Sequence, residues 1–182
     1  MKFAPLPLAG AYLIDLEPLG DKRGFFARMF CTEEFAEHDL ETRWAQCNTS
    51  YTAFAGTVRG MHFQRPPMAE VKLLRCLRGA IWDVIVDLRD GSPSYGRWHG
   101  EKLDEHNRSM LYVPRGFAHG FQTLTDDVEM LYFHSTPYSK AHEGGLRWDD
   151  QAVSIEWPLD KTGQSARDAA FPGLDAVEPL RI

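Results

Sequence analysis

Ala80-Ile81-Trp82-Asp83-Val84-Ile85-Val86-Asp87-Leu88 is the stretch of this 182-residue chain that most clearly indicates its fold. Its even positions from 82 onward are all apolar, whereas its odd positions alternate isoleucine with aspartate. Because successive side chains of a β-strand point to opposite faces of the sheet, the even face is predicted to be core. Two carboxylates among apolar residues suit the lining of a partly hydrated cavity better than a second dry core.

The runs on either side of this stretch have the same short-strand character. Arg78-Gly79 offers a turn, so the preceding run 71–77 is predicted to form a hairpin with 80–88. Further strands are predicted at 95–103, 109–113, 119–123 and 128–133, separated by residues typical of turns. Helix is expected only in short pieces, at 32–37 and 165–170. Many short strands predict a mainly β fold, a β-sandwich or jelly roll.

Composition sets the class of protein. With 43% hydrophobic and 25% charged residues, and with no repeat or linker, residues 1–182 are expected to form one domain with its own core. A net charge of -6, from 20 basic and 26 acidic residues, argues against nucleic acid as a partner. No apolar run approaches the roughly 18 residues of a membrane helix, so no membrane partner is expected. The first residues do not lead into a signal-peptide core, and the expected location is the cytoplasm.

Cysteine and histidine bear on possible metal sites. Cys31, Cys47 and Cys76 are odd in number and form no C-x-x-C pair, which argues against a zinc knuckle or a thioredoxin-like site. Two of the seven histidines, His62 and His119, stand in glycine- and aromatic-flanked strands. Barrels that bind a metal often use a His-x-His pair, but positions 60 and 64 are glycine and glutamine. No metal site is therefore predicted, and isolated histidines favour proton chemistry.

Several motifs together resemble one known family. They are residues 21–26 (DKRGFF), 58–64 (VRGMHFQ), 72–75 (KLLR), 114–121 (PRGFAHGF), 132–138 (YFHSTPY), 145–150 (GLRWDD), 155–158 (IEWP) and 167–170 (RDAA). In order and spacing the chain resembles the dTDP-4-dehydrorhamnose 3,5-epimerase family over nearly its whole length. The resemblance implies a cupin-like jelly-roll barrel or sandwich and a homodimer. It also implies an isomerase, without metal or cofactor, that inverts C3 and C5 of the nucleotide sugar dTDP-4-dehydro-6-deoxy-D-glucose.

The resemblance also implies catalytic roles for four residues. His62 would remove a proton beside the C4 ketone, and the carboxylate of Asp168 would hold its imidazole in one tautomer. Lys72 would stabilise the enolate oxygen. Tyr132 would return a proton from the opposite face, because inversion requires groups on both sides of the carbon. The substrate-binding positions implied by the resemblance are Arg23, Phe26, Gln46, Asn48, Arg59, His119, Tyr138, Glu143 and Arg167.

The spacing of Arg59 and His62 presents a geometric problem. Residues three apart on a regular strand point to opposite faces, so both cannot reach one cavity. We therefore expect either a bulge around Gly60 or an Arg59 that serves the ligand of a neighbouring subunit.

Some nucleotide-side positions depart from the family pattern. Cys47 and Thr49 stand where Asp and His are common in the family. Arg28 stands where Glu is frequent, Arg167 where Lys is usual, and Gly144 where Arg is common. The predicted cavity rim, with Arg23, Arg28, Arg59, Lys72 and Arg167, is consequently more positive. These departures leave alternatives open: a mono-epimerase acting at C3 or C5, a different nucleotide such as CDP or GDP, or a non-catalytic sugar-nucleotide binding cupin. A metal-dependent cupin is opposed by the missing His-x-His pair.

Overall fold

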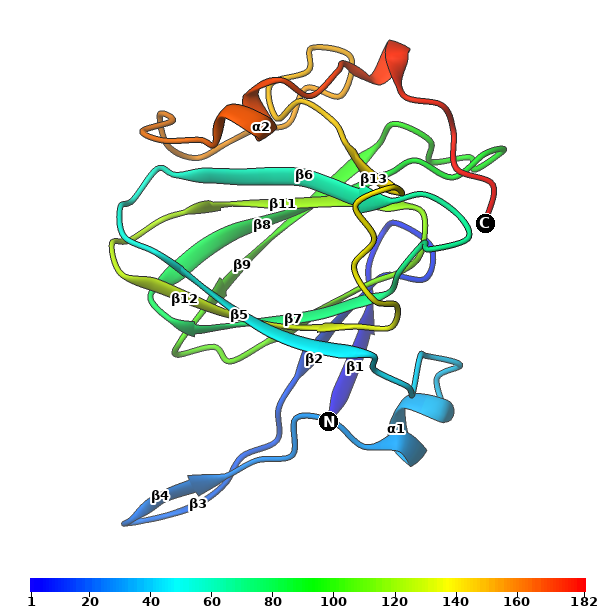
Figure 1. Ribbon diagram of the computed structural model, residues 1–182. Coiled ribbons are helices and arrows are strands. Elements are labelled where there is room, and N and C mark those ends of the chain that lie inside the picture. The colour runs from blue at the N-terminus through cyan, green and yellow to red at the C-terminus, as the bar shows by residue number, and fades with distance from the viewer.

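The computed structural model describes residues 1–182 as two stacked antiparallel sheets with short helical segments around them (Figure 1). The larger sheet has the strand order β1-β2-β10-β7-β12-β5, the smaller sheet β13-β6-β11-β8-β9, and β3 and β4 form a separate ribbon. The elements are β1 Lys2–Pro5, β2 Tyr12–Asp15, β3 Leu19–Asp21, β4 Gly24–Phe26, α1 Thr32–Ala36, β5 Gln46–Thr52, β6 Val58–Gln64, β7 Lys72–Arg78, β8 Ala80–Asp87, β9 Trp98–Asp104, β10 Met110–Val113, β11 Phe117–Thr123, β12 Val128–His134, β13 Glu143–Gly145, α2 Ala166–Ala169 and the 3-10 helix η1 Leu174–Ala176.

This architecture confirms the prediction of a mainly β jelly-roll fold, in the form of a sandwich whose sheets do not close into a barrel. The two short helices lie where they were expected, and the predicted strands agree with observed ones to within a few residues. None of the helices is long and apolar enough to span a membrane.

The predicted hairpin at Arg78-Gly79 is wrong. β7 belongs to the larger sheet and β8 to the smaller one, so the chain crosses between the sheets at Gly79 instead of folding back within one of them. Gly79 has a φ of +75°, and a Cβ there would lie 2.5 Å from Oγ1 of Thr125. The sequence signal for a tight turn was real, but such a turn can also form the corner of a sandwich.

Both faces of β8 are buried, which explains its dense apolar pattern. Val84 and Val86 on the even face pack beneath the C-terminal segment, beside Val153 and Leu180. Figure 1 shows this orange and red segment lying over the smaller sheet. Ile81 and Ile85 on the odd face belong to the core between the sheets. The predicted even-face core is confirmed, and the odd face is largely core as well.

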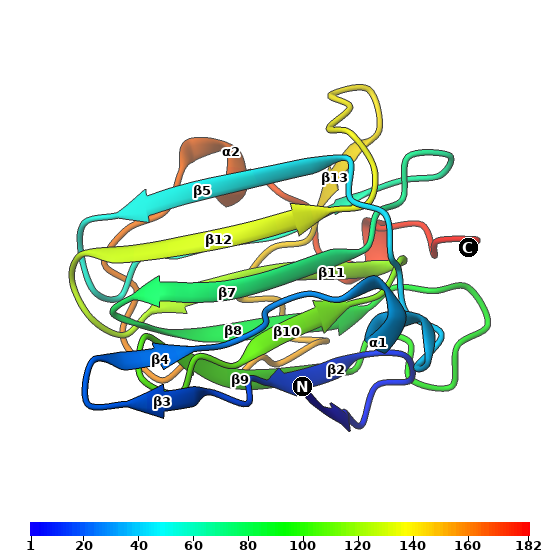
Figure 2. The ribbon, with the colours of Figure 1, turned by 90° about the horizontal axis from the view of Figure 1, so that it is seen from below.

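The core between the sheets lies toward one side of the sandwich. Its members come largely from β7, β8, β10 and β11, and include Leu74, Ile85, Leu111 and Phe121. Figure 2 shows β5 at the opposite edge of the larger sheet from β1 and β2. Polar residues replace apolar ones between the sheets toward β5, β12 and β6, and this is where the cavity lies.

Candidate active site

Two adjoining hollows open between the sheets. The first, which we call the His119 hollow, has a volume of about 270 Å³ and includes Ser50, Arg59, His119 and Tyr132 in its lining. The second, the Glu143 hollow, has a volume of about 290 Å³ and is lined in part by Gln46, Tyr138, Glu143 and Arg167. Asn48, His62, Lys72 and His134 line both of them. The two hollows therefore form one cleft, and the residues common to both include two of the predicted catalytic residues, His62 and Lys72, on opposite sheets.

His62 on β6 is held by Asp168 of α2, as predicted. The Nε2 atom of His62 lies 2.9 Å from Oδ1 of Asp168, and Oδ2 of Asp168 accepts a hydrogen bond of 3.0 Å from the backbone N–H of Gly60. Burial opposes ionisation of Asp168, yet these hydrogen bonds and the nearby imidazole hold its pKa well below the ordinary value. An ionised Asp168 accepts the Nε2 proton, which leaves Nδ1 of the neutral imidazole free to act as a base.

Arg167 connects this pair to the Glu143 hollow. It donates to Oε1 of Glu143 at 2.7 Å and to Oδ1 of Asp168 at 3.3 Å. Its Nη2 also lies 3.1 Å from Nε2 of His62. In the tautomer that donates Nε2–H to Asp168, that last contact is not a hydrogen bond but the approach of a positive charge. Arg167 therefore places a cation beside the imidazole, at the boundary between the His62–Asp168 pair and the Glu143 hollow.

A bulge in β6 brings Arg59 and His62 to the same hollow. His119 pairs with His62 and Phe121 pairs with Arg59, so three steps along β6 face two steps along β11. Gly60 allows this because its φ is +130° and a Cβ would approach Cα of Gly120 to 2.6 Å. The predicted bulge is confirmed. Arg59 also donates from Nε to Thr52 of its own chain at 2.8 Å.

Lys72 lies on the larger sheet and reaches across toward β6. Its side chain is nearly buried, and Nζ donates to the backbone carbonyl of His62 at 3.1 Å. The carboxylate of Glu70 is 3.3 Å from the same Nζ. Lys72 thus places a fixed positive charge at the part of the cleft that both hollows share, where it can stabilise a developing oxyanion.

Tyr132 on β12 faces the hollow from the larger sheet, opposite the β6 wall that carries His62. Its hydroxyl lies 2.9 Å from Oγ of Ser50. Burial raises the pKa of Tyr132 far above its ordinary value, so the phenol is protonated at neutral pH. A protonated phenol and a histidine base therefore face the same space from two walls.

His119 forms a second buried pair with Asp83. Nε2 of His119 lies 3.0 Å from both carboxylate oxygens of Asp83, and both side chains are nearly inaccessible to solvent. Burial raises the pKa of Asp83 and lowers that of His119. The sequence predicted that the carboxylates on the odd face of β8 line a cavity. Asp83 does not line the cleft itself, but it binds His119, which does. Asp87 instead binds Arg89, Ser92 and Ser94 in the following turn.

Five predicted substrate-binding residues gather at the Glu143 hollow, namely Gln46, Asn48, Tyr138, Glu143 and Arg167. Oε1 of Gln46 accepts a hydrogen bond of 2.5 Å from the backbone N–H of Tyr138, which fixes the loop after β12. The hydroxyl of Tyr138 donates to Oε2 of Glu143 at 3.2 Å. Residues far apart in sequence therefore meet at one hollow, as the predicted binding role requires.

Two of the predicted rim residues, Arg23 and Arg28, and the predicted binding residue Phe26 lie away from the cleft. Arg23 and Phe26 belong to the β3–β4 ribbon, which projects from the sandwich (Figure 1), and they line a hollow of their own. Arg23 is paired with Asp21, and Phe26 is 73% exposed. Arg28 binds Glu34 near α1. The rim of this chain's own cleft is therefore less positive than predicted, because Arg23 and Arg28 do not reach it.

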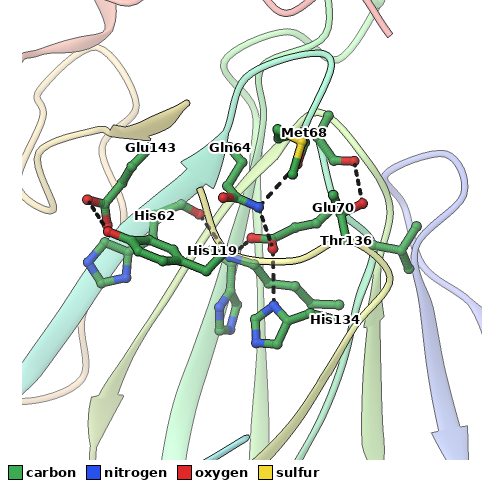
Figure 3. Close-up of polar contacts among 12 residues, drawn as sticks. His62, Gln64, Met68, Glu70, His119, His134, Thr136 and Glu143 are labelled. Carbon is green, nitrogen blue, oxygen red and sulfur yellow. Dashed lines mark hydrogen bonds and ion pairs between the residues drawn. The ribbon is translucent and has the colours of Figure 1, made fainter. Parts of the chain in front are cut away.

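Three residues that the sequence did not indicate complete the cleft. The carboxylate of Glu70 contacts Lys72. It is also hydrogen-bonded to Gln64 and to His134 (Figure 3). His134 sits two residues after Tyr132 on a regular strand, so its alternation with Tyr132 was the one available signal. Nowhere do three or more His, Cys, Asp or Glu side chains form a group that could hold a metal ion.

Known proteins resemble this chain over nearly all its length. Residues 5–176 match the family model described as dTDP-4-dehydrorhamnose 3,5-epimerase. A dTDP-4-dehydrorhamnose 3,5-epimerase from Sinorhizobium fredii is 45% identical over 175 residues, covering 96% of this chain and 90% of that protein. A dTDP-4-dehydrorhamnose 3-epimerase from Streptomyces niveus is 38% identical, covering 92% of this chain and 81% of that protein. The structure of a dTDP-6-deoxy-D-glucose-3,5-epimerase from Legionella pneumophila, in complex with dTDP-4-keto-L-rhamnose, superposes with a TM-score of 0.92 at 32% identity, covering 99% of this chain and 97% of that chain.

Proposed function

The chain belongs to the dTDP-4-dehydrorhamnose 3,5-epimerase family, and from this premise we propose that it inverts C3, C5 or both in a nucleotide-linked 4-keto-6-deoxy sugar. The substrate proposed first is dTDP-4-dehydro-6-deoxy-D-glucose, with dTDP-4-dehydro-L-rhamnose as the product. One observation carries the proposal: the His62–Asp168 pair and the Tyr132 phenol face one hollow from opposite sheets. Inversion of a carbon requires removal of a proton from one side and its return from the other.

In the proposed reaction, Nδ1 of His62 removes the proton from a carbon next to the C4 ketone. The electron pair of that C–H bond moves into the ring, and the ketone oxygen becomes an enolate oxygen beside Nζ of Lys72. Tyr132 then donates its phenolic proton to the opposite face of the carbon, and the ketone re-forms. Asp168 stabilises the imidazolium that is present between the two steps.

The nucleotide diphosphate is proposed to occupy the arginine-lined part of the cleft. Arg59 lines the His119 hollow and Arg167 lines the Glu143 hollow, so guanidinium groups lie on both sides of the part of the cleft that the two hollows share. Guanidinium groups bind phosphate oxygens through paired hydrogen bonds. Gln46, Asn48, Tyr138, Glu143 and His119 are proposed to contact the nucleotide or the sugar.

We further propose that the protein acts as a homodimer in which the β3–β4 ribbon of each protomer reaches the cleft of the other. Arg23 and Phe26 have binding roles by family resemblance, yet they lie on a projecting ribbon outside their own cleft. Leu19 and Phe26 on this ribbon are each more than 70% exposed. Apolar side chains displayed in this way are typical of a protein interface.

Proton NMR in D2O with dTDP-4-dehydro-6-deoxy-D-glucose tests the activity. We expect deuterium to replace the hydrogens at C3 and C5 and the inverted product to accumulate. Exchange and inversion at a single carbon would identify a mono-epimerase, the activity that the name of the Streptomyces niveus relative describes. If neither hydrogen exchanges, the same assay with CDP- and GDP-linked 4-keto sugars decides whether the nucleotide or the activity itself was assigned wrongly.

A further inference from the structure

A third histidine–carboxylate pair of the cleft lies on the wall opposite His62. Nδ1 of His134 is 3.2 Å from Oε2 of Glu70, and the two side chains are only 18% and 10% exposed. Figure 3 shows a carboxylate oxygen of Glu70 joined by dashed lines to Gln64 on one side and to His134 on the other. None of the steps described above uses this pair, although His134 lines both hollows.

The carboxylate of Glu70 is held by three side chains. Oε2 accepts a hydrogen bond of 3.0 Å from Nε2 of Gln64, and Oε1 lies 3.3 Å from Nζ of Lys72. Burial opposes its ionisation, but Lys72 and His134 together hold the pKa of Glu70 below its ordinary value. The ionised carboxylate thus presents one oxygen to Lys72 and the other to His134. Glu70 therefore lies between the lysine and the imidazole and contacts both of them.

His134 and Tyr132 stand side by side on β12. Their rings are 6.1 Å apart between centroids and within 30° of parallel, as expected for residues i and i+2 on one strand face. Because β12 belongs to the larger sheet and β6 to the smaller, both rings face the cleft from the side opposite His62. Two proton donors therefore lie together on the wall from which inversion must be completed.

We propose that His134, held by Glu70, is a second general acid of the cleft, which protonates one of the two carbons beside the ketone while Tyr132 protonates the other. The inference rests on the proposed function, with both carbons inverted. C3 and C5 lie on either side of C4, so a substrate whose C4 oxygen is held at Lys72 presents both carbons to the same wall. Two donors side by side match two carbons side by side.

The proposed step balances in protons and electrons. His62 takes the proton from the carbon, and the enolate forms. The imidazolium of His134 then gives its Nε2 proton to that carbon. The enolate electron pair forms the new C–H bond, and the electrons of the broken N–H bond stay on Nε2. His134 is left neutral, with Nδ1–H donated to Glu70, and water at its partly exposed ring restores the proton.

The variant His134→Asn tests this role without removing the contact to Glu70. The asparagine amide can occupy the place of Nδ1 and donate to Glu70, but it cannot transfer a proton. Inversion at C3 and at C5 is measured separately by NMR for the wild type, His134→Asn and Tyr132→Phe. His106→Asn serves as a matched control, because His106 is an exposed turn residue with its side chain 84% accessible.

We expect His134→Asn to slow inversion at one carbon by about 100-fold and at the other by less than about 2-fold. Tyr132→Phe should show the reverse selectivity, and the control should match the wild type. A merely structural role would slow both carbons alike, so equal losses or no loss in His134→Asn would overturn the proposal. Inversion of only one carbon by the wild type would overturn it too. A wild type with no exchange at any carbon would instead contradict the proposed function.

Discussion

At the scale of single residues, the proposed base and the proposed acid lie on opposite walls of the cleft and differ in their chemistry. His62 has one ring nitrogen committed to Asp168, and the Tyr132 phenol is kept protonated by burial. The imidazole of His62 has a second ring nitrogen that can accept a proton, whereas the protonated phenol of Tyr132 can only donate one. Removing either group should therefore affect different measurements.

His62→Asn is expected to lower deuterium exchange at both carbons by at least about 100-fold. The other imidazole on that wall, His119, is buried, and its lowered pKa makes it a weaker base. Tyr132→Phe should leave exchange within about 10-fold of the wild type while it slows inversion at its carbon much more. Exchange and inversion are followed in the same NMR sample. If Tyr132→Phe abolished exchange as completely as His62→Asn, the assignment of acid and base to opposite walls would be wrong.

Asp87 gives a prediction about stability that is separate from catalysis. Burial opposes its ionisation, but hydrogen bonds from Arg89, Ser92 and Ser94 lower its pKa to about 2. A carboxyl whose pKa is lowered by folding stabilises the native state above its unfolded pKa, and this contribution is lost as pH falls from about 4 toward 2. Asp87→Asn should consequently lower the free energy of unfolding by about 2 kcal/mol at pH 7.

Urea unfolding from pH 7 down to the lowest pH at which the fold persists tests this linkage. The difference in free energy of unfolding between the wild type and Asp87→Asn should become smaller as the pH falls below about 4. Asp90→Asn is the control, since Asp90 forms an exposed ion pair with Arg181 and its loss should cost less than about 0.5 kcal/mol. A gap of constant size at all pH values would show that lost packing, not charge, accounts for the effect.

The sequence identified the residues whose motif is local, and it missed those whose role depends on tertiary neighbours. His62, Lys72 and Tyr132 stand in recognisable strands, and the structure brings all three to one cleft. Glu70 and His134 meet across 64 residues of sequence, and either alone reads as an ordinary strand or loop residue. Only the pairing of β7 with β12, which sets His134 opposite Lys72, brings them together.

At the scale of elements, strand positions were predictable but some strand partners were not. Alternation within 80–88 marks a strand whatever its neighbours are, whereas Arg78-Gly79 is compatible both with a hairpin and with a corner between sheets. In the structure it forms a corner, because β7 and β8 belong to different sheets. The even face of β8 is covered by a C-terminal segment that is distant in sequence. Periodicity reports how one strand is buried and not which strand lies beside it.

The bulge in β6 was predictable because two motif residues of opposite parity needed the same cavity. The bulge requires a glycine at position 60, where φ is +130° and the backbone lies against β11. Gly60→Ala should lower the free energy of unfolding by about 2 kcal/mol or more, since the new Cβ would lie 2.6 Å from Cα of Gly120.

Gly24→Ala is a matched control for that substitution. Gly24 has a nearly equal φ of +135°, but a Cβ there would have no neighbour within 4 Å. It should cost about 1 kcal/mol or less, because only backbone strain is added. Thermal or urea unfolding of both variants measures the difference. Equal losses would mean that the close approach of β6 to β11 is not what requires glycine at position 60.

At the scale of the whole molecule, one chain holds two incomplete parts of one proposed site. The cleft carries the acid, the base and two arginines, while Arg23 and Phe26 remain on the projecting ribbon. No sequence pattern indicates that a motif serves a neighbouring copy, because a motif carries no information about which chain will use it. The departure of these two residues from the cleft is therefore the observation that argues for a dimer.

Complementation between two inactive variants tests this exchange of ribbons. Arg23→Ala should weaken nucleotide binding at the partner's cleft, and His62→Asn should disable the cleft of its own chain. If each ribbon serves the other protomer, a mixed dimer has one site with both lesions and one site with none. Co-refolding equal amounts of the two variants should therefore restore about a quarter of wild-type activity at low substrate concentration, because half of the dimers are mixed and each holds one intact site.

The mixing ratio and the controls make this result specific. Ribbons that served their own clefts would give mixed dimers with one lesion in every site, and activity would not rise above the average of the two variants. Co-refolding Arg23→Ala with wild type measures the residual activity that the first variant contributes. Analytical ultracentrifugation of each sample establishes that dimers are present, so that a failure to complement contradicts ribbon exchange and not dimer formation. Because restored activity requires both lesions to fall in one site of the mixed dimer and leave the other site intact, it cannot arise from a ribbon that merely stabilises its own chain.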